Sequence, residues 1–392
     1  MKRNIIIIFI FITFYIFSAN INVDELNIIS LAGFNSTTNK FEMNTYFKFL
    51  TSFDGGYKFA AKVGFEANVT QLAKNYLDSS TDIYNKVFLI FNNAEITARN
   101  LIESRLDLAF WAGTYRYLGE GNFYRGFLYF PESQNLDYKG VYRLRGSGIS
   151  TILRFWEDKF KLQFHLYQNT NFVSSTSPTA FNYFSFDTEI GLFLKYASIE
   201  LFGGYTKDFI YPNDNSDLIY GRGKVGLTFW TGDSRYIEFF SSVGVTGLDS
   251  KTFDSVTNGT ISVIDMFYIS AELHFKLFIT DHIISFLTKP YLYNEEVTNE
   301  KSDFNINYRF NVAVNDSPLN GGFIFNFTYS LLDPNDNWHL YLSPYISIKI
   351  SGVIWDINVH YDFSRIDVAT RTGNNIVALE GLKLVLGVSS RF

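Results

Sequence analysis

DFNINYRFNVAV, residues 303 to 314, alternates between apolar and polar side chains along its whole length. The even positions hold Phe304, Ile306, Tyr308, Phe310, Val312 and Val314, and the odd positions include Asp303, Asn305, Asn307, Arg309 and Asn311. Because successive side chains of a β-strand point to opposite faces, this segment is predicted to be a strand with one apolar face and one hydrated face.

The same alternation recurs in most later segments, for example in FYISAELHFKL (267–277), GVIWDINVHYDF (352–363) and LKLVLGVSSRF (382–392). A soluble β-sandwich also alternates, but its strands are typically about 5 to 6 residues long. Runs of about 10 to 13 residues match a tilted strand that crosses a membrane, and a closed barrel satisfies every backbone group in lipid. We therefore predict an all-β fold, a transmembrane antiparallel β-barrel forming one domain over residues 20–392.

Counting the alternating segments gives about 18 strands (range 16 to 18), and 18 is an even number, as a single-chain bacterial barrel needs. They are residues 26–34, 41–50, 57–67, 87–98, 105–117, 140–155, 160–168, 183–195, 197–206, 222–230, 235–246, 264–277, 281–289, 303–314, 321–330, 338–349, 352–363 and 376–392.

Short and long connections alternate between these strands, as they do between the two ends of an outer-membrane barrel. The short connections include residues 156–159, 196–198, 231–235 and 280–282. A strand within residues 118–139 would make the count odd, so we interpret this segment as a long loop that folds inward and constricts the lumen.

The N-terminus has the layout of a secretory signal peptide. Lys2 and Arg3 precede an apolar run over residues 5–17, and small and polar residues follow around Ala19. A membrane-spanning helix, the alternative, needs about 20 apolar residues. We predict a signal peptide over residues 1–19, which directs the chain to the outer membrane.

Composition excludes several classes of protein. The net charge of −6, from 33 basic and 39 acidic residues, argues against a nucleic-acid partner. The chain has no cysteine, which excludes disulfides, thiolate metal sites and a lipid anchor attached through cysteine. We expect no cofactor and no metal site.

An enzyme is not expected either. HExxH and GxSxG motifs are absent, and the five histidines are spread over distant segments. His165, His274 and His360 fall on hydrated faces, where we interpret them as solvated residues of the lumen.

FNNAEITARNLIESRLDLAFWAGTYRY, residues 91–117, resembles a block of the maltoporin family of carbohydrate-selective outer-membrane porins. The turn Asn100–Glu103 and the strand motif Trp111–Gly113 carry this resemblance, and NTYFKF (44–49) resembles the second strand of the family. The resemblance implies an 18-stranded homotrimeric barrel with an inward-folded third loop. It also implies transport of sugars along a row of aromatic residues in the lumen.

Single positions agree only in part with this family. Tyr46 falls on an aromatic residue of the sugar track. Lys48 stands where the family has an acid, Asn92 where it has an arginine, and Arg391 where it has a tryptophan. These departures leave the identity of the solute open.

The predicted constriction has its own binding chemistry. Tyrosine rings can stack on sugar rings, and charged groups can hydrogen-bond sugar hydroxyls. Alternatively, the tyrosines pack the loop on the wall and the charges only set a field across the pore. The candidate pore-lining residues are Tyr115, Arg116, Glu120, Tyr124, Arg125 and Tyr129, besides Tyr46, Lys48, Asn92 and Arg391.

The C-terminal Phe392 lies on the lipid-facing side of the last predicted strand. It resembles the signal by which the barrel assembly machinery recognises its clients. The prediction is an outer-membrane porin for passive diffusion of small hydrophilic solutes, either general or carbohydrate-preferring. A surface barrel without transport, such as an adhesin or a structural outer-membrane protein, remains the alternative.

Overall fold

The computed structural model describes twelve parts of the chain. They are residues 20–35, 40–68, 90–119, 142–170, 183–208, 222–248, 257–258, 266–289, 303–313, 317–330, 338–373 and 376–390. The predicted signal peptide (1–19), most of the predicted constriction loop and the two C-terminal residues lie outside these parts.

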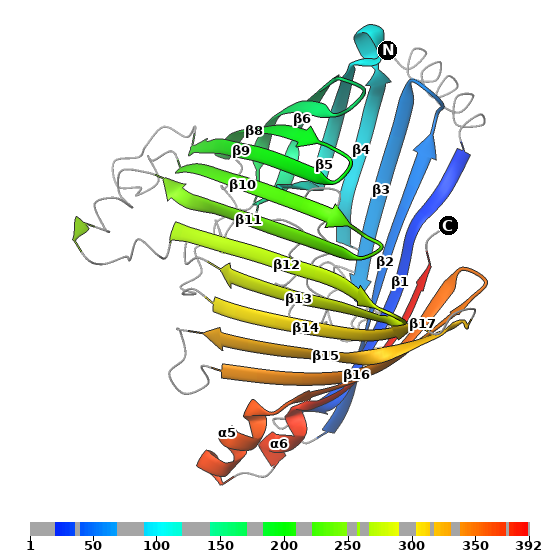
Figure 1. The fold of residues 1–392 in the computed structure, drawn as a ribbon, viewed down its shortest axis with the longest axis vertical. Coiled ribbons are helices and arrows are strands. Elements are labelled where there is room, and N and C mark those ends of the chain that lie inside the picture. The colour runs from blue at the N-terminus through cyan, green and yellow to red at the C-terminus, as the bar shows by residue number, and fades with distance from the viewer. Residues whose placement is uncertain are drawn as a thin grey trace, which may run out of the picture.

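Eighteen strands form one antiparallel sheet (Figure 1). They are β1 (Asn20–Asn35), β2 (Lys40–Asp54), β3 (Phe59–Asn68), β4 (Ile90–Asn100), β5 (Leu106–Leu118), β6 (Tyr142–Phe155), β7 (Phe160–Asn169), β8 (Tyr183–Phe193), β9 (Ala197–Asp208), β10 (Arg222–Asp233), β11 (Ile237–Leu248), β12 (Phe267–Leu277), β13 (Thr280–Lys289), β14 (Asp303–Ala313), β15 (Leu319–Ser330), β16 (Trp338–Ile350), β17 (Val353–Asp362) and β18 (Leu382–Ser390). Every predicted strand corresponds to one of them.

The sheet closes on itself. Each strand pairs with its neighbours in the sequence, and β18 pairs with β1 from Leu26↔Ser390 to Gly33↔Lys383. Closure leaves no unpaired edge strand, which is the condition for placing a sheet in lipid. The predicted 18-stranded barrel is confirmed.

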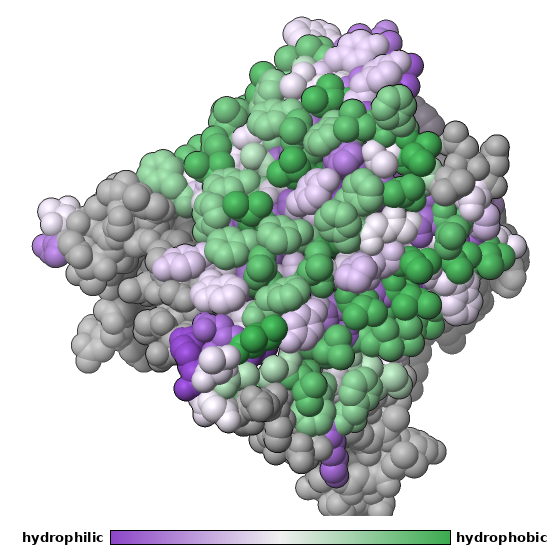
Figure 2. All heavy atoms as spheres, turned by 60° about the horizontal axis from the view of Figure 1, so that its bottom comes forward, coloured by the Kyte–Doolittle hydropathy of each residue, from purple (hydrophilic) through white to green (hydrophobic). Residues whose placement is uncertain are grey.

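The alternation of the sequence sorts side chains between the two faces of the barrel. On β17, Trp355 and Val359 are exposed on the outside while His360 is buried inside. Figure 2 shows one side of the molecule, over which apolar side chains form a broad surface. The outer wall is therefore suited to contact hydrocarbon.

Two boundaries differ from the prediction. The first strand begins at Asn20 rather than at residue 26. The last predicted strand, residues 376–392, begins instead with the helix α6 (Ile376–Glu380), and β18 starts at Leu382. A short apolar run such as IVAL fits a strand and a helix equally well, so periodicity alone could not separate them.

A second helix, α5 (Ser364–Thr372), follows β17 and packs on α6. Both lie beyond the end of the barrel at which the long connections occur, which we call the loop end (Figure 1). None of the helices in the described parts of the chain is long and apolar enough to cross a membrane.

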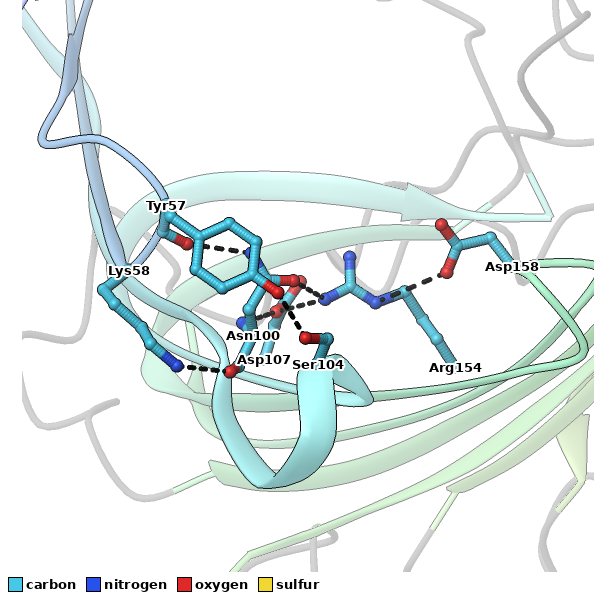
Figure 3. A network of polar contacts seen from close by, with 7 residues as sticks. All are labelled: Tyr57, Lys58, Asn100, Ser104, Asp107, Arg154 and Asp158. Atoms are coloured by element: carbon cyan, nitrogen blue, oxygen red, sulfur yellow. Dashed lines mark hydrogen bonds and ion pairs between the residues drawn. The ribbon is translucent and has the colours of Figure 1, made fainter.

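The opposite end, which we call the turn end, carries the short connections, and a polar network ties three of them together (Figure 3). Arg154 of β6 donates to Asp107 Oδ1 at 2.6 Å and to Asn100 Oδ1 at 3.0 Å. Lys58 Nζ donates to the Asn100 carbonyl at 2.7 Å. Tyr57, Ser104 and Asp158 complete the network. These bonds fix the relative positions of the β2–β3, β4–β5 and β6–β7 turns.

Candidate functional site

Two parts of the inner face of the barrel differ in how deeply their side chains are buried. From β5 to β12 the inward side chains are buried almost without interruption, and we call this face the packed wall. From β17 through β18 and β1 to β4 most inward side chains are only half-buried, and we call this face the open wall. The two walls give the lumen a filled side and an accessible side.

An apolar cluster occupies the part of the packed wall nearer the loop end. Its buried members are Trp111, Leu118, Tyr142, Leu144, Tyr167, Phe202 and Tyr268, and Tyr115 packs against them. The Tyr115 ring lies parallel to the Trp111 ring, with centroids 5.0 Å apart. The sequence pattern predicts a hydrated inner face, whereas here the inner face carries an apolar core. Side chains therefore fill this side of the lumen.

Charged residues of the packed wall are paired within it. Lys224 Nζ lies 3.1 Å from Asp187 Oδ1, and both side chains are almost fully buried. Arg116 Nη1 donates to Gln163 Oε1 at 2.5 Å, and its Nη2 lies 3.4 Å from Glu189 Oε1. An unpaired charge buried at these positions would destabilise the fold, and each of these partners offsets that cost.

The chain enters the lumen at both ends of the predicted constriction loop. Directly after β5, the Gly119 N–H faces Glu189 of β8, and its carbonyl accepts a bond from Thr228 of β10 at 3.0 Å. At the start of β6, the Tyr142 hydroxyl donates to the Val245 carbonyl of β11 at 3.0 Å. Both ends therefore contact strands that lie beyond β7 in the sheet. The chain can reach those strands only by leaving the wall and entering the lumen.

Gly119 has a local reason to be glycine. Its φ is +64°, and a Cβ there would lie 2.2 Å from the Phe202 ring. No larger residue could turn the chain inward at this point without displacing that ring.

The open wall carries Tyr46 and Lys48. The Tyr46 side chain is half-buried and lies between Ile29 of β1 and Asn68 of β3 in the register. Lys48 Nζ lies 3.4 Å from Glu25 Oε1, and the lysine retains 31% of its side-chain exposure. Both residues face the lumen, as the alternation predicts.

Asn92 also reaches the open wall, at an irregularity of β4. The pairing of β3 with β4 shifts between Gly64 and Phe65, and the extra residue on β4 is Asn92. Its Nδ2 donates to Glu66 Oε1 at 2.9 Å, and Glu66 is the register partner of Lys48. Three of the candidate residues, Tyr46, Lys48 and Asn92, therefore lie on one surface.

The other described candidates, Tyr115 and Arg116, lie on the packed wall. A shift of the β5–β6 register between Thr114 and Arg116 makes Tyr115 a bulge residue, so both consecutive side chains point inward. Glu120, Tyr124, Arg125, Tyr129, Arg391 and Phe392 lie outside the described residues.

Three histidines interpreted as solvated are in fact enclosed. His165 is fully buried, with Nδ1 2.7 Å from Ser150 Oγ. His274 Nε2 lies 2.5 Å from Glu272 Oε1, and His360 Nδ1 lies 2.7 Å from Ser343 Oγ. The predicted face was correct and the predicted solvation was wrong, because alternation does not report how far the lumen is filled.

Phe202 and Trp230, two aromatic residues that fill the packed wall, were not singled out from the sequence, although one signal was present. Phe202 is in phase with the polar residues Glu200 and Thr206 of β9, and Trp230 is in phase with Thr228 of β10. An aromatic residue in the polar phase of a strand indicates that the inner face there is packed rather than hydrated.

One cluster at the loop end contains the residue types of a hydrolase. His339 Nδ1 lies 3.1 Å from both Asp362 Oδ2 and Ser364 Oγ. The Ser364 hydroxyl donates to Asp362 Oδ1 at 2.7 Å, and its backbone N–H donates to the same oxygen at 3.0 Å. A nucleophilic serine would give its proton to the imidazole. The Ser364 hydroxyl bonds the carboxylate instead, so the cluster anchors the start of α5.

A metal centre is not formed by the part of the chain that the structure describes: it brings together no group of three His, Asp or Glu residues able to hold an ion.

Comparison with solved structures identifies the class of fold. The chain is similar to Acinetobacter baumannii OccAB3, with a TM-score of 0.53, 11% identity, and 96% of this chain and 100% of that chain covered. It is similar to Pseudomonas aeruginosa OccK8, with a TM-score of 0.53, 9% identity and coverages of 96% and 98%. The outer membrane protein OpdK of Pseudomonas aeruginosa has a TM-score of 0.50, 9% identity and coverages of 95% and 99%.

No family model matches the chain, and no curated protein matches it. At these identities the similar structures establish the fold alone, which is that of outer-membrane porins.

Proposed function

We propose that this protein is an outer-membrane porin that forms a water-filled channel for passive diffusion of small hydrophilic solutes. The open wall is the observation that carries the proposal. It is a half-buried surface of mostly polar side chains inside a closed barrel whose outer face is apolar. A solute that crosses such a barrel exchanges its hydration shell for fixed polar groups without meeting lipid.

The proposed route follows the open wall, because the packed wall leaves little accessible surface. The charged side chains of the open wall include Lys48, Lys62, Lys383, Glu42, Glu66, Glu95 and Asp356. Groups of both signs along one surface can hydrogen-bond solute hydroxyls and hold ordered water. This arrangement suits small polar solutes in general.

The same proposal fixes the orientation of the protein. The short turns would face the periplasm and the long connections the exterior, as in other outer-membrane barrels. Export through residues 1–19, assembly through Phe392 and a homotrimeric state belong to this proposal. Fold similarity to outer-membrane porins supports it.

We further propose a preference for carbohydrates, which the resemblance of residues 91–117 and 44–49 to maltoporins supports. Tyr46 is the residue that would stack on a sugar ring, since its side chain is half-buried on the open wall and flanked by Lys48.

Planar-bilayer recordings of current block by a panel of sugars test this preference. We expect sugars at millimolar concentration to interrupt the wild-type current, and Tyr46→Ala to weaken the block by about five- to ten-fold, because one stacking contact contributes about 1 kcal/mol. Phe47→Ala is the matched control, since Phe47 is the neighbouring residue on the lipid-facing side. Absence of block by any sugar would leave a general diffusion pore.

One observation favours a second candidate function, a surface barrel without transport. The apolar cluster of the packed wall fills part of the lumen, as a structural barrel would allow. Conductance separates the two candidates: a structural barrel inserts into the bilayer and passes no ions, whereas a porin opens on insertion.

A further inference from the structure

Two neighbouring connections at the turn end share a construction that the channel does not use. In the β8–β9 connection, Lys195 Nζ lies 4.8 Å from the centre of the Tyr196 ring. In the β10–β11 connection, the Arg235 guanidinium lies 5.6 Å from the centre of the Tyr236 ring. All four side chains are exposed. Each connection therefore presents one cation above one aromatic ring.

The two connections lie side by side. The Tyr196 carbonyl accepts bonds from Gly232 N and Thr231 Oγ1, both at 3.0 Å, and these two residues belong to the end of β10. Lys195, Tyr196, Arg235 and Tyr236 thus form one patch, which we call the rim patch.

The donors of the rim patch are only partly used. Arg235 bonds Asp233 through Nε and Nη2, with Nη2 2.6 Å from Asp233 Oδ2, and Nη1 takes no part in this pairing. Lys195 forms no ion pair with any residue in the described parts of the chain. With Lys195 and Arg235 positive and Asp233 negative, these three residues carry a net charge of +1, and the Lys195 and Arg235 side chains are exposed.

A comparable cation–aromatic pair at the turn end already bonds other residues of the protein. Lys58 Nζ lies 5.3 Å from the centre of the Tyr57 ring, but it donates to the Asn100 carbonyl, and the Tyr57 hydroxyl bonds Ser104 (Figure 3). The pair at β2–β3 holds the polar network together. The cation–aromatic pairs of the rim patch do not link neighbouring turns in this way.

The outer face of the barrel next to the rim patch is apolar. Ile199 and Leu201 of β9 and Ile237 and Phe239 of β11 are exposed on the outer face. A ligand that fits both surfaces has an anionic, acceptor-rich head and hydrocarbon chains long enough to cover the wall.

We propose that the rim patch binds the headgroup of an acidic phospholipid of the adjacent leaflet. Lys195 and Arg235 donate to the phosphate oxygens, the Tyr196 and Tyr236 rings lie at the level of the glycerol, and the acyl chains cover the wall between β9 and β11. The identity of the leaflet rests on the proposed outer-membrane orientation, in which the turn end faces the periplasm. The chemistry of the patch does not depend on it.

Native mass spectrometry of the folded protein in detergent micelles tests this site. Dioleoyl-phosphatidylglycerol and dioleoyl-phosphatidylcholine are added separately, and the lipids retained by the protein are counted. We expect the wild type to retain phosphatidylglycerol in preference. We expect Lys195→Gln/Arg235→Gln to lower that retention by on the order of 25-fold, since each basic residue near a membrane surface contributes about five-fold.

Two variants serve as controls. Lys58→Gln removes a charge from an occupied pair of the same rim and should leave retention unchanged, whereas the charge-preserving Lys195→Arg/Arg235→Lys should retain the lipid. The proposal is overturned by equal retention of the two lipids, by undiminished retention in the glutamine variant, or by an equal loss in Lys58→Gln. Lipid retention is measured without current, so a failure of conductance refutes the porin function and leaves the lipid site standing.

Discussion

At the scale of single residues, the buried ion pair of Lys224 and Asp187 has the clearest energetic consequence. Its atoms lie 3.1 Å apart, and the two side chains retain 6% and 0% of their exposure. Asp187 also accepts a bond from the Tyr167 hydroxyl at 2.8 Å. Removing the lysine would leave a buried carboxylate with a neutral donor but no cation.

We therefore expect Lys224→Met to lower the free energy of unfolding by about 3–5 kcal/mol, as for other buried pairs that lose one partner. The double variant Lys224→Met/Asp187→Asn should cost clearly less, because it removes both charges. Urea titration in micelles measures both values. A single variant no more destabilised than the double variant would show that the pair is solvated, and hence that the packed wall is open to water.

At the level of single residues, alternation predicts which face of the barrel a side chain occupies, but not what surrounds it. It assigns Tyr46 and Lys48 to the inner face, and both belong to the open wall. It could not place Asn92, because a bulge inserts one extra residue and no turn or glycine signal marks it. Nor could it show that Tyr115 packs on Trp111, since that contact depends on how the ends of β5 and β6 lie in the lumen.

At the scale of elements, each strand separates lipid from lumen by the alternation of its side chains. On β17, Val359 is exposed on the outer face, and its neighbour Asn358 faces the lumen on the open wall. The two positions have the same height in the barrel and meet different solvents, which makes them a matched pair.

Val359→Lys should destabilise the folded barrel in lipid by about 2–4 kcal/mol, the cost of a lysine on the lipid face near the bilayer midplane. Asn358→Lys should cost less, because this side chain faces the lumen and does not enter the hydrocarbon. Folding titrations into phosphatidylcholine vesicles give both values. Equal costs would mean that the two faces of β17 are not distinguished by solvent.

The strands were predictable as elements and the helices were not. Long alternating runs give a strong signal, and all eighteen strands were found. The segments of α5 and α6 lie in a region expected to be a loop or the start of a strand. Helix α5 begins with Ser364 bonded to Asp362, and His339 bonds both residues only once β16 and β17 have paired.

At the scale of the whole molecule, the closed barrel and its even number of strands can be predicted from the sequence. The difference between the packed wall and the open wall cannot. An even count and alternating connections specify a closed barrel. The packed wall arises from aromatic residues on five strands, β5, β6, β7, β9 and β12, that meet only after the barrel has closed. Their meeting places the accessible surface on the opposite side, along the open wall.

The proposed solute route is therefore off-centre, and because the chain has no cysteine, introduced thiols can test it directly. Asn44→Cys places a thiol on the open wall, and Ser242→Cys places one on the packed wall. The measurement is the single-channel current of each variant in a planar bilayer before and after a water-soluble methanethiosulfonate reagent. We expect an open channel whose current falls only for Asn44→Cys. A barrel that inserts without conducting, or a current that falls only for Ser242→Cys, would contradict it.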